Sequence, residues 1–351
     1  APEPAPTFHP LDTAMKAELA TRINALLDSK GFEKAHWGVL ITSLETGDVW
    51  YERNADRLFM PASNQKILTT AAAMLALGPD FRFRTEVSHS GTIEGGVLKG
   101  DLVVRGDGDP TLYGGPSPAM RFYDDTRQVF RAWAAELKSK GITRITGRVV
   151  GDDDAWDDEH RGDGWPEREN EAWYYAEYGP LTLTENVLDL TITPPASAGE
   201  RVRIEPRVPS GYYSIDNRVT AVAEGAKGIA IDRPWGTNRI VITGSVKAGA
   251  DAIEDSCTIT NPTAFYATVL RETLVAEGIA IDGAATDIDD AADWKTARPA
   301  TSLLITHDSP PLREIAARLM KRSQNMYSET MIHRLAMTRT DGPATFDDGV
   351  K

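Results

Sequence analysis

The spacing of apolar residues predicts a helix, a hairpin and a second helix near the start of the chain. Apolar side chains recur at helical spacing over residues 11–30, and Gly31 can end that helix. Two strand-like runs, residues 36–42 and 49–53, are joined by a Thr-Gly-Asp turn and therefore predict a hairpin. The Ala- and Leu-rich residues 64–77, which a Gly-Pro pair follows, predict a buried helix of about four turns.

The middle of the chain has a different pattern. Short Val- and Thr-rich runs alternate with glycines over residues 83–260, which predicts a mostly β segment. The strands expected there are residues 85–90, 97–104, 145–150, 187–193, 202–205 and 239–243, with one helix at 126–140. Helical spacing returns at Asn261, which can cap a helix, and two more helices are predicted over 309–320 and 326–336. We therefore expect three parts, residues 1–84, 85–260 and 261–351.

The composition excludes several kinds of partner and site. The 351 residues include 52 Asp and Glu against 38 Lys and Arg, a formal net charge of −14, so the surface repels nucleic acid and anionic lipid. No apolar run of about 18 residues occurs, so no transmembrane segment is predicted. The single cysteine, Cys257, rules out an internal disulfide and a cysteine-cluster metal site. The Pro-rich residues 1–10 are typical of a mature exported protein and favour a secreted or periplasmic location.

Ser63 and Lys66 form an S-x-x-K motif at the start of the Ala-rich helix. Residues three apart share one helix face, so the lysine amine can reach the serine hydroxyl. A desolvated lysine with a lowered pKa can take the serine proton without any histidine. The helix N-terminus adds free backbone N–H groups that suit a developing oxyanion. The bare motif is common on protein surfaces, but its position here favours Ser63 as a nucleophile.

Ser323 and Asn325 form an S-x-N motif between the last two predicted helices. A hydroxyl and an amide on one loop can pass a proton to a leaving amine and hold a lysine and a substrate carbonyl. By itself this triplet is more typical of a polar link between helices. Its value as a signal comes from its occurrence together with S-x-x-K.

The two motifs and their surroundings resemble the class C, low-molecular-mass penicillin-binding proteins, which are D-Ala-D-Ala carboxypeptidases and endopeptidases. The likeness covers nearly the whole chain and is greatest to the exocellular actinomycete type. The family-like segments are residues 59–85 (FMPASNQKILTTAAAMLALGPDFRFRT), 100–112, 142–158, 231–245 and 320–332. The resemblance implies an α/β fold, in which a penicillin-recognising serine transpeptidase-like domain is interrupted by a large insertion of two β-rich domains.

The resemblance also implies the chemistry of the four motif residues. Ser63 would be the nucleophile, Lys66 the general base, Ser323 the proton relay and Asn325 a positioning donor. The family uses no metal or organic cofactor. The implied substrates are peptidoglycan stem peptides, from which the enzyme removes the terminal D-Ala or opens D-Ala–diamino-acid cross-links. β-Lactams are the implied covalent inhibitors, and the cell wall is the implied place of action.

One motif of that family is missing from its expected place. A K-T-G triplet should follow S-x-N, but none occurs after Asn325. Lys295-Thr296-Ala297 precedes S-x-N and lies in a polar stretch, so we interpret it as an unrelated loop. We therefore expect a further C-terminal segment of about 100 residues that carries K-T-G.

Asp152, Asp153 and Trp156 belong to an acidic run that follows a predicted strand. The run fails the EF-hand pattern because Trp156 stands where a third calcium ligand is needed. A solvated acidic turn is an equally good interpretation. In the family that the chain resembles, an aspartate of the corresponding loop recognises the free amine of the substrate's diamino acid. The resemblance therefore implies Asp152 or Asp153 as a substrate-binding residue, with Trp156 as a packing wall.

Two alternative functions share the first two motifs. A β-lactamase would need a glutamate that activates the deacylating water, but no E-x-x-L-N segment occurs and the large insertion is foreign to that class. A non-catalytic, penicillin-binding-like scaffold protein would keep the fold without turnover, and the missing K-T-G would favour it if the chain were complete. Covalent β-lactam labelling and D-Ala release together separate the three functions.

Overall fold

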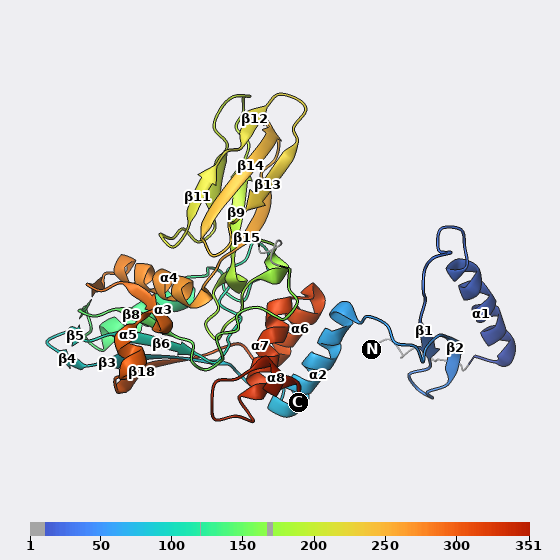
Figure 1. Cartoon of the computed structure of the whole chain (residues 1–351), viewed down its shortest axis with the longest axis horizontal. Coiled ribbons are helices and arrows are strands. Elements are labelled where there is room, and N and C mark those ends of the chain that lie inside the picture. The colour runs from blue at the N-terminus through green and yellow to red at the C-terminus, as the bar shows by residue number, and fades with distance from the viewer. Residues whose placement is uncertain (1–10, 120, 167–170) are drawn as a thin grey trace, which may run out of the picture. The chain divides into compact units, whose positions relative to one another are not determined.

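The computed structural model describes residues 11–119, 121–166 and 171–351. The chain divides into two units, residues 1–64 and 65–351 (Figure 1). The Pro-rich residues 1–10, on which the expected export depends, lie outside the described residues. Among the helices of the described residues, none is long and apolar enough to cross a membrane.

The first unit contains the predicted helix and hairpin. Helix α1 (Thr13–Leu27) is followed by strands β1 (Val39–Thr42) and β2 (Val49–Arg53), which pair antiparallel. The hydroxyl of the buried Tyr51, on β2, donates a hydrogen bond to the side-chain oxygen of Asn24 at 2.7 Å. This bond joins the helix to the hairpin.

Helices from the two ends of the second unit pack together. Their bounds are α2 (Gln65–Leu77), α6 (Leu312–Arg322), α7 (Asn325–Ala336) and α8 (Phe346–Val350). Helix α7 packs against the other three, as Figure 1 shows for α2 and α6. The apolar residues of α6 recur every three or four positions, at Leu312, Ile315 and Leu319, and all three are buried. Residues separated by most of the sequence therefore share one small core.

A five-stranded sheet adjoins these helices, in the order β17-β8-β6-β3-β18. Its strands are β3 (Arg84–Ser90), β6 (Leu102–Gly106), β8 (Val149–Asp152), β17 (Ala285–Asp287) and β18 (Thr301–Asp308). The parallel strands β6 and β8 are apolar on both faces, as is typical of a sheet covered on both sides. Val104 and Val149 pack in the core that includes α3 (Gln128–Ser139) and α4 (Pro262–Ala276). Val103 and Val150 pack against Trp294 of α5 (Ala292–Thr296).

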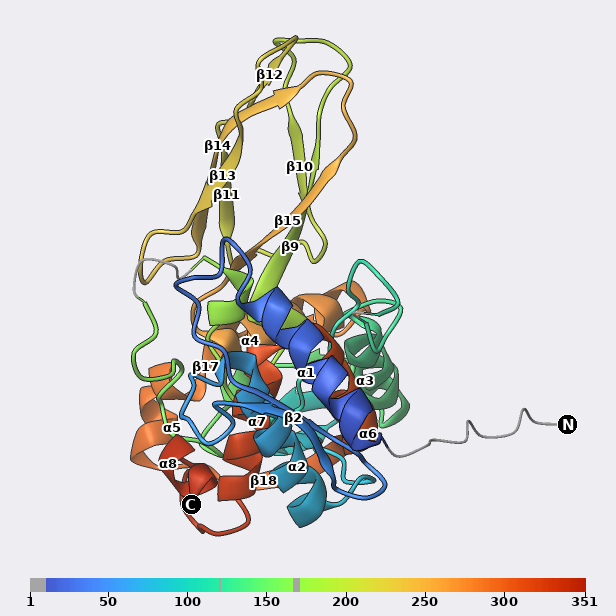
Figure 2. The same ribbon diagram turned by 90° about the vertical axis from the view of Figure 1, so that its right-hand side faces the viewer.

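Two further sheets form an elongated β extension that projects away from the helices of the second unit (Figures 1 and 2). The strands of the extension are β9 (Val187–Thr193), β10 (Arg203–Pro206), β11 (Ser214–Asn217), β12 (Thr220–Val222), β13 (Gly228–Asp232), β14 (Arg239–Lys247) and β15 (Ile253–Thr258). One sheet has the order β10-β9-β15, and the other is centred on β14. Leu190 and Ile192 of the first sheet and Ile240 and Ile242 of the second are buried in one core.

A small sheet completes the unit, in the order β16-β7-β5-β4. Its strands are β4 (Thr92–Glu94), β5 (Val97–Lys99), β7 (Arg144–Ile145) and β16 (Ala280–Ile281). Strands β16, β17 and β18 all follow residue 261, yet they pair with β7, β8 and β3. The end of the chain thus completes sheets that the β-rich middle begins. The division into residues 1–84, 85–260 and 261–351 remains a prediction.

The strands predicted over 85–90, 187–193, 202–205 and 239–243 are confirmed as β3, β9, β10 and β14. The run 97–104 is divided into β5 and β6, and the run 145–150 overlaps the end of β7 and the start of β8. The loop predicted at Lys295-Thr296-Ala297 is wrong. Lys295 and Thr296 form the last part of helix α5, which the buried Trp294 anchors against the sheet. The helix was not predicted because its sequence is mostly polar. One buried apolar side chain, that of Trp294, is enough to hold an element of five residues.

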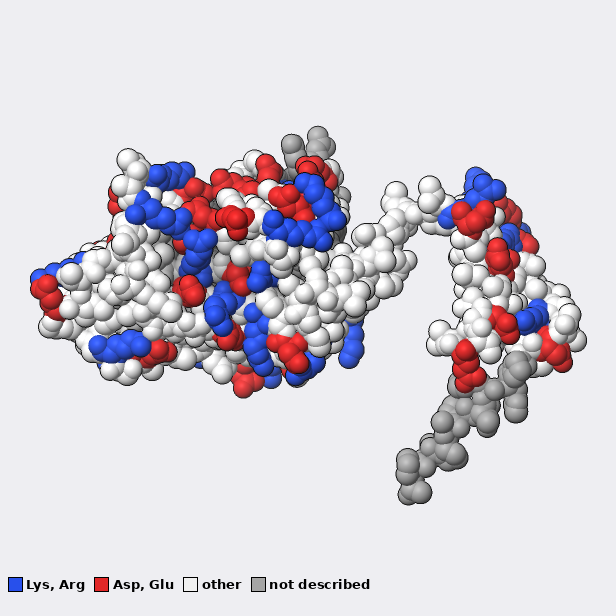
Figure 3. Space-filling model, turned by 90° about the horizontal axis from the view of Figure 1, so that it is seen from below, with Lys and Arg blue, Asp and Glu red and all other residues white. Residues whose placement is uncertain are grey.

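Charged side chains of both signs are intermixed on the face of the second unit that Figure 3 shows. This face therefore has no single acidic patch, despite the net charge of −14.

Some of the ion pairs include a buried carboxylate. The carboxylate of Asp101, which is 8% exposed, accepts hydrogen bonds from the Arg148 backbone N–H (2.7 Å), the Arg148 guanidinium (2.7 Å) and the Trp294 indole N–H (2.8 Å).

Replacing Asp101 tests whether this carboxylate joins α5 to the central sheet. Asp101→Ala should lower the free energy of unfolding by about 3 kcal/mol, because it removes one of the two carboxylates that pair with the Arg148 guanidinium and leaves the Arg148 backbone N–H and the buried indole N–H without their acceptor. Asp293→Ala is the matched control, since Asp293 is an exposed partner of the same guanidinium and its loss should lower the stability clearly less. Urea unfolding measures both values, and equal losses would contradict the role given to Asp101.

Candidate active site

Ser63 lies in the short turn that leads into helix α2. It is the middle residue of a 3-10 helix, η1 (Ala62–Asn64), and the second unit begins directly afterwards at Gln65. Ala62 has a φ of 45°, in the left-handed region that residues with a Cβ rarely adopt. Backbone strain of this kind is concentrated at functional sites. The turn before the predicted nucleophile is therefore held in an unusual conformation.

Lys66 and Asn325 meet between helices α2 and α7. The ammonium Nζ of Lys66 donates a hydrogen bond to Oδ1 of Asn325 at 2.6 Å. The Lys66 side chain is in the first turn of α2, and the residue is only 8% exposed. The Asn325 amide donates in turn to the backbone carbonyl of Tyr174 at 2.8 Å, which fixes the orientation of the amide group. The structure thus brings the predicted base and the predicted positioning residue into direct contact.

Ser323 is the residue at which α6 ends. Its φ of 59° and ψ of 39° are left-handed, and its N–H donates to the carbonyl of Leu319 at 2.7 Å. Gln324 then begins α7, because its side-chain oxygen accepts a hydrogen bond from the Met326 N–H at 3.3 Å. The position predicted for S-x-N, between two helices, is therefore confirmed, and its left-handed serine explains why α6 and α7 do not merge.

Glu329 is a site residue that the sequence motifs did not reveal. It lies four residues after Asn325 and therefore on the same face of α7, next to Lys66. Burial raises the pKa of Glu329 to about 7, and the charge of Lys66 opposes that rise. Burial also lowers the pKa of Lys66, an effect that the charge of Glu329 opposes. The amine is thus easier to deprotonate than an exposed lysine, as a general base requires.

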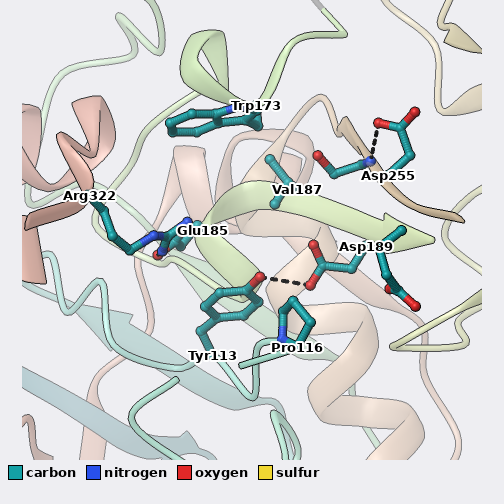
Figure 4. A pocket seen from close by; sticks show the side chains of 10 residues that line it. Tyr113, Pro116, Trp173, Glu185, Val187, Asp189, Asp255 and Arg322 are labelled. Carbon is teal, nitrogen blue, oxygen red and sulfur yellow. Dashed lines mark hydrogen bonds and ion pairs between the residues drawn. The ribbon is translucent and has the colours of Figure 1, made fainter. Parts of the chain in front are cut away.

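The second missed feature is the aromatic 3-10 helix η3 (Trp173–Tyr175). Its Tyr174 carbonyl holds Asn325, and Trp173 lines a cavity of about 430 Å³ beside the S-x-N loop (Figure 4). Arg322, which precedes Ser323, forms part of the same wall. The sequence shows the three adjacent aromatic residues of η3 in a polar stretch, but it does not indicate that they contact α7.

Asp152 and Asp153 are at the carboxyl end of β8, where other groups engage them. The Asp152 carboxylate forms ion pairs with Arg105 (3.4 Å) and with Arg298. One oxygen of Asp153 accepts a hydrogen bond from the Thr263 hydroxyl at 2.6 Å. Burial and the nearby charge of Asp287 raise the pKa of Asp153, which makes it a weaker partner for an ammonium group. Their predicted role in substrate binding remains a prediction.

Trp156 is buried on the other side of this loop. Its ring stacks on His333 of α7, with centroids 4.5 Å apart and planes 22° apart. Trp156 is therefore a packing residue between the acidic loop and the helix that carries Asn325. Of the described residues, Asp153, Asp287 and Asp289 have the arrangement of a possible cation site, with carboxylate oxygens within 4.8 Å of one another.

Comparison with known proteins identifies the family of the chain. Residues 19–351 match the D-Ala-D-Ala carboxypeptidase 3 (S13) family. The chain belongs to this family. The matched range includes all four motif residues, Ser63, Lys66, Ser323 and Asn325, and their individual roles remain predictions.

Individual relatives are similar to this chain along most of its length. The chain is 34% identical over 347 residues to the D-alanyl-D-alanine carboxypeptidase of Actinomadura sp. strain R39, covering 96% of this chain and 60% of the relative. The crystal structure of penicillin binding protein 4 from Haemophilus influenzae matches with a TM-score of 0.72 at 25% identity, covering 89% of this chain and 65% of that one. A second structure of that protein, complexed with a novel β-lactam, matches with a TM-score of 0.67 at 23% identity, covering 94% and 66%.

These matches confirm the predicted fold class, an α/β penicillin-recognising domain with a large β-rich insertion. The chain spans about 60% of the length of the carboxypeptidase that it matches.

Replacing Glu329 tests its burial beside Lys66. Below about pH 4.5 this carboxyl is protonated in both folded and unfolded chains, so it imposes no penalty. As the pH rises to 7 and above, the unfolded chain ionises first, and the folded state loses stability. Glu329→Gln should therefore gain about 2–3 kcal/mol over the wild type between pH 4.5 and pH 8. Urea unfolding at both pH values measures this, and a stability difference independent of pH would show that the carboxyl is not desolvated.

Proposed function

We propose that the protein is a serine-type D-Ala-D-Ala carboxypeptidase that acts on peptidoglycan stem peptides and is acylated by β-lactams. The observation that carries the proposal is the 2.6 Å bond between Lys66 and Asn325, which joins the S-x-x-K helix to the S-x-N loop. Membership in the S13 family supports the same activity. A peptidoglycan substrate favours a secreted or periplasmic enzyme associated with the cell wall.

The chemistry would proceed through an acyl-enzyme on Ser63. The neutral amine of Lys66 takes the hydroxyl proton as Oγ attacks the carbonyl carbon of the penultimate D-Ala. The peptide C–N bond breaks, Ser323 relays a proton to the departing amine, and the terminal D-Ala leaves. A water molecule then hydrolyses the ester and regenerates the serine. Asn325 would hold the Lys66 amine in place, and the lowered pKa of Lys66 supports its role as the base.

Cleavage of D-Ala–diamino-acid cross-links would use the same steps with a larger leaving amine, so we propose endopeptidase activity as well. With a β-lactam, the same attack opens the lactam ring, and the leaving nitrogen stays attached to the adduct. Stable labelling with little turnover would distinguish the peptidase from a β-lactamase. Release of D-Ala from a peptide would distinguish it from a scaffold protein.

Replacement of the motif residues tests the acyl-enzyme directly. Ser63→Ala should abolish covalent labelling by penicillin, because no other residue is proposed to form the ester. Lys66→Ala should slow labelling by about a hundredfold or more, since a positioned base typically contributes that much. Intact-mass spectrometry follows the adduct, and circular dichroism confirms that each variant is folded. A folded Ser63→Ala protein that still forms a stable penicilloyl adduct would refute the proposal.

Specificity for a free amine tests the acidic loop. If Asp152 or Asp153 binds the side-chain ammonium of the substrate, replacing it with Ala should lower kcat/KM about ten- to a hundredfold for peptides that carry the amine. Simple penicillins lack that amine and should acylate as before. Asp154→Ala is the control, because Asp154 shares Arg298 with Asp152 and lies in the same loop. Equal losses on peptide and penicillin would mean that the loop has only a structural role.

A further inference from the structure

A buried carboxylate holds both neighbours of Ser323. Oε1 of Glu185 accepts a hydrogen bond from the Arg322 guanidinium at 2.7 Å, and Oε2 accepts one from the Gln324 side-chain amide at 2.6 Å. Glu185 is only 2% exposed. Because Arg322 and Gln324 flank Ser323 in sequence, one side chain fixes the loop on both sides of the serine.

Glu185 is presented by a backbone turn that residues with a Cβ rarely adopt. Thr184, Glu185 and Asn186, which form η4, have φ values of 55°, 54° and 55°, three consecutive left-handed residues. The turn is held by other bonds: the Asn186 amide donates to the Glu177 carbonyl at 2.8 Å, and the Thr184 N–H donates to the Leu112 carbonyl at 2.9 Å. Neighbouring segments thus fix the turn, and the turn aims the carboxylate at the loop.

The hold on Gln324 extends to the start of α7. Its amide nitrogen binds Glu185, while its amide oxygen caps the helix by accepting from the Met326 N–H. Asn325 lies between Gln324 and Met326 and forms the bond to Lys66. The Glu185 carboxylate therefore fixes the position of Gln324 and, through it, the first residues of α7.

We propose that Glu185 is a positioning residue for catalysis, which orients the Ser323 hydroxyl by clamping Arg322 and Gln324. The proposal rests on the role of Ser323 as proton relay. Glu185 does not itself exchange a proton with the substrate. Its carboxylate restricts the conformation of the loop through two buried hydrogen bonds, to Arg322 and to Gln324. Hydrogen bonds to an ionised carboxylate are stronger than those between neutral groups.

The cavity beside the loop supplies a matched control. Glu254 lines the same cavity as Glu185 and Arg322. Its carboxylate pairs with Arg207 at 3.7 Å and accepts a hydrogen bond from the Thr191 hydroxyl at 2.9 Å. The same isosteric change, Glu to Gln, can therefore be made at two places in one cavity, only one of which is bonded to the residues around Ser323.

The test compares penicillin acylation by the wild type with four variants: Glu185→Gln, Ser323→Ala, the double variant and Glu254→Gln. Glu185→Gln should lower the limiting acylation rate about ten- to a hundredfold, as expected for a displaced catalytic group, and leave the penicillin concentration for half-maximal rate unchanged. Glu254→Gln should acylate at the wild-type rate. In the Ser323→Ala background, Glu185→Gln should have no further effect, because the group that it positions is gone.

Several outcomes would overturn the proposal. A wild-type rate for folded Glu185→Gln would do so, and so would losses that multiply in the double variant, because Glu185 would then act independently of Ser323. If Glu185→Gln does not fold, Arg322→Gln replaces it, and the same non-additivity with Ser323→Ala must be seen. A wild-type rate for Ser323→Ala would instead contradict the proton relay of the proposed function, on which this inference depends.

Discussion

The hydrogen bond between Lys66 and Asn325 is the interaction on which the rest of the site depends. It connects the first turn of α2 to the first residue of α7, two segments that the whole β-rich middle separates in sequence. Packing of α2 against α6 and α7 brings them together. The β-rich sheets of the second unit can therefore form an extension while Lys66, Ser323 and Asn325 stay within one small group of its helices.

This packing also imposes an electrostatic constraint. The Lys66 amine loses part of its hydration when it is buried, so its pKa falls. Burial of the neighbouring Glu329 carboxyl raises the pKa of that group to about 7. The two groups limit each other's shifts because their opposite charges attract. On the other side of the loop, the fully buried Glu185 is compensated by Arg322 and Gln324. Both oxygens of the buried Glu185 thus have a polar partner, as a carboxylate in a water-poor site requires.

The sequence was informative where chemistry and periodicity are local. S-x-x-K lies at the start of an apolar helix, and S-x-N lies in a helix-to-helix link, so both motifs could be placed without knowledge of the tertiary structure. Strands β16 and β17 could not be predicted, because a run of two or three residues is too short to show an alternation of apolar and polar side chains. These segments are strands only because they pair with β7 and β8. Glu185 and Glu329 were missed for a related reason. Their importance comes from neighbours that folding supplies, and a single glutamate has no signature of its own.

The protonation of Lys66 tests the account most directly. In protein labelled with 13C-lysine, the Lys66 side-chain resonance can be assigned by comparison with Lys66→Arg and followed through a pH titration. The account predicts that Lys66 titrates below the 10.5 of an ordinary lysine, because packing between α2 and α7 buries its amine. A Lys66 that titrates at 10.5 or above would be a fully protonated cation at neutral pH. It could not take the proton of Ser63, and the account would be contradicted.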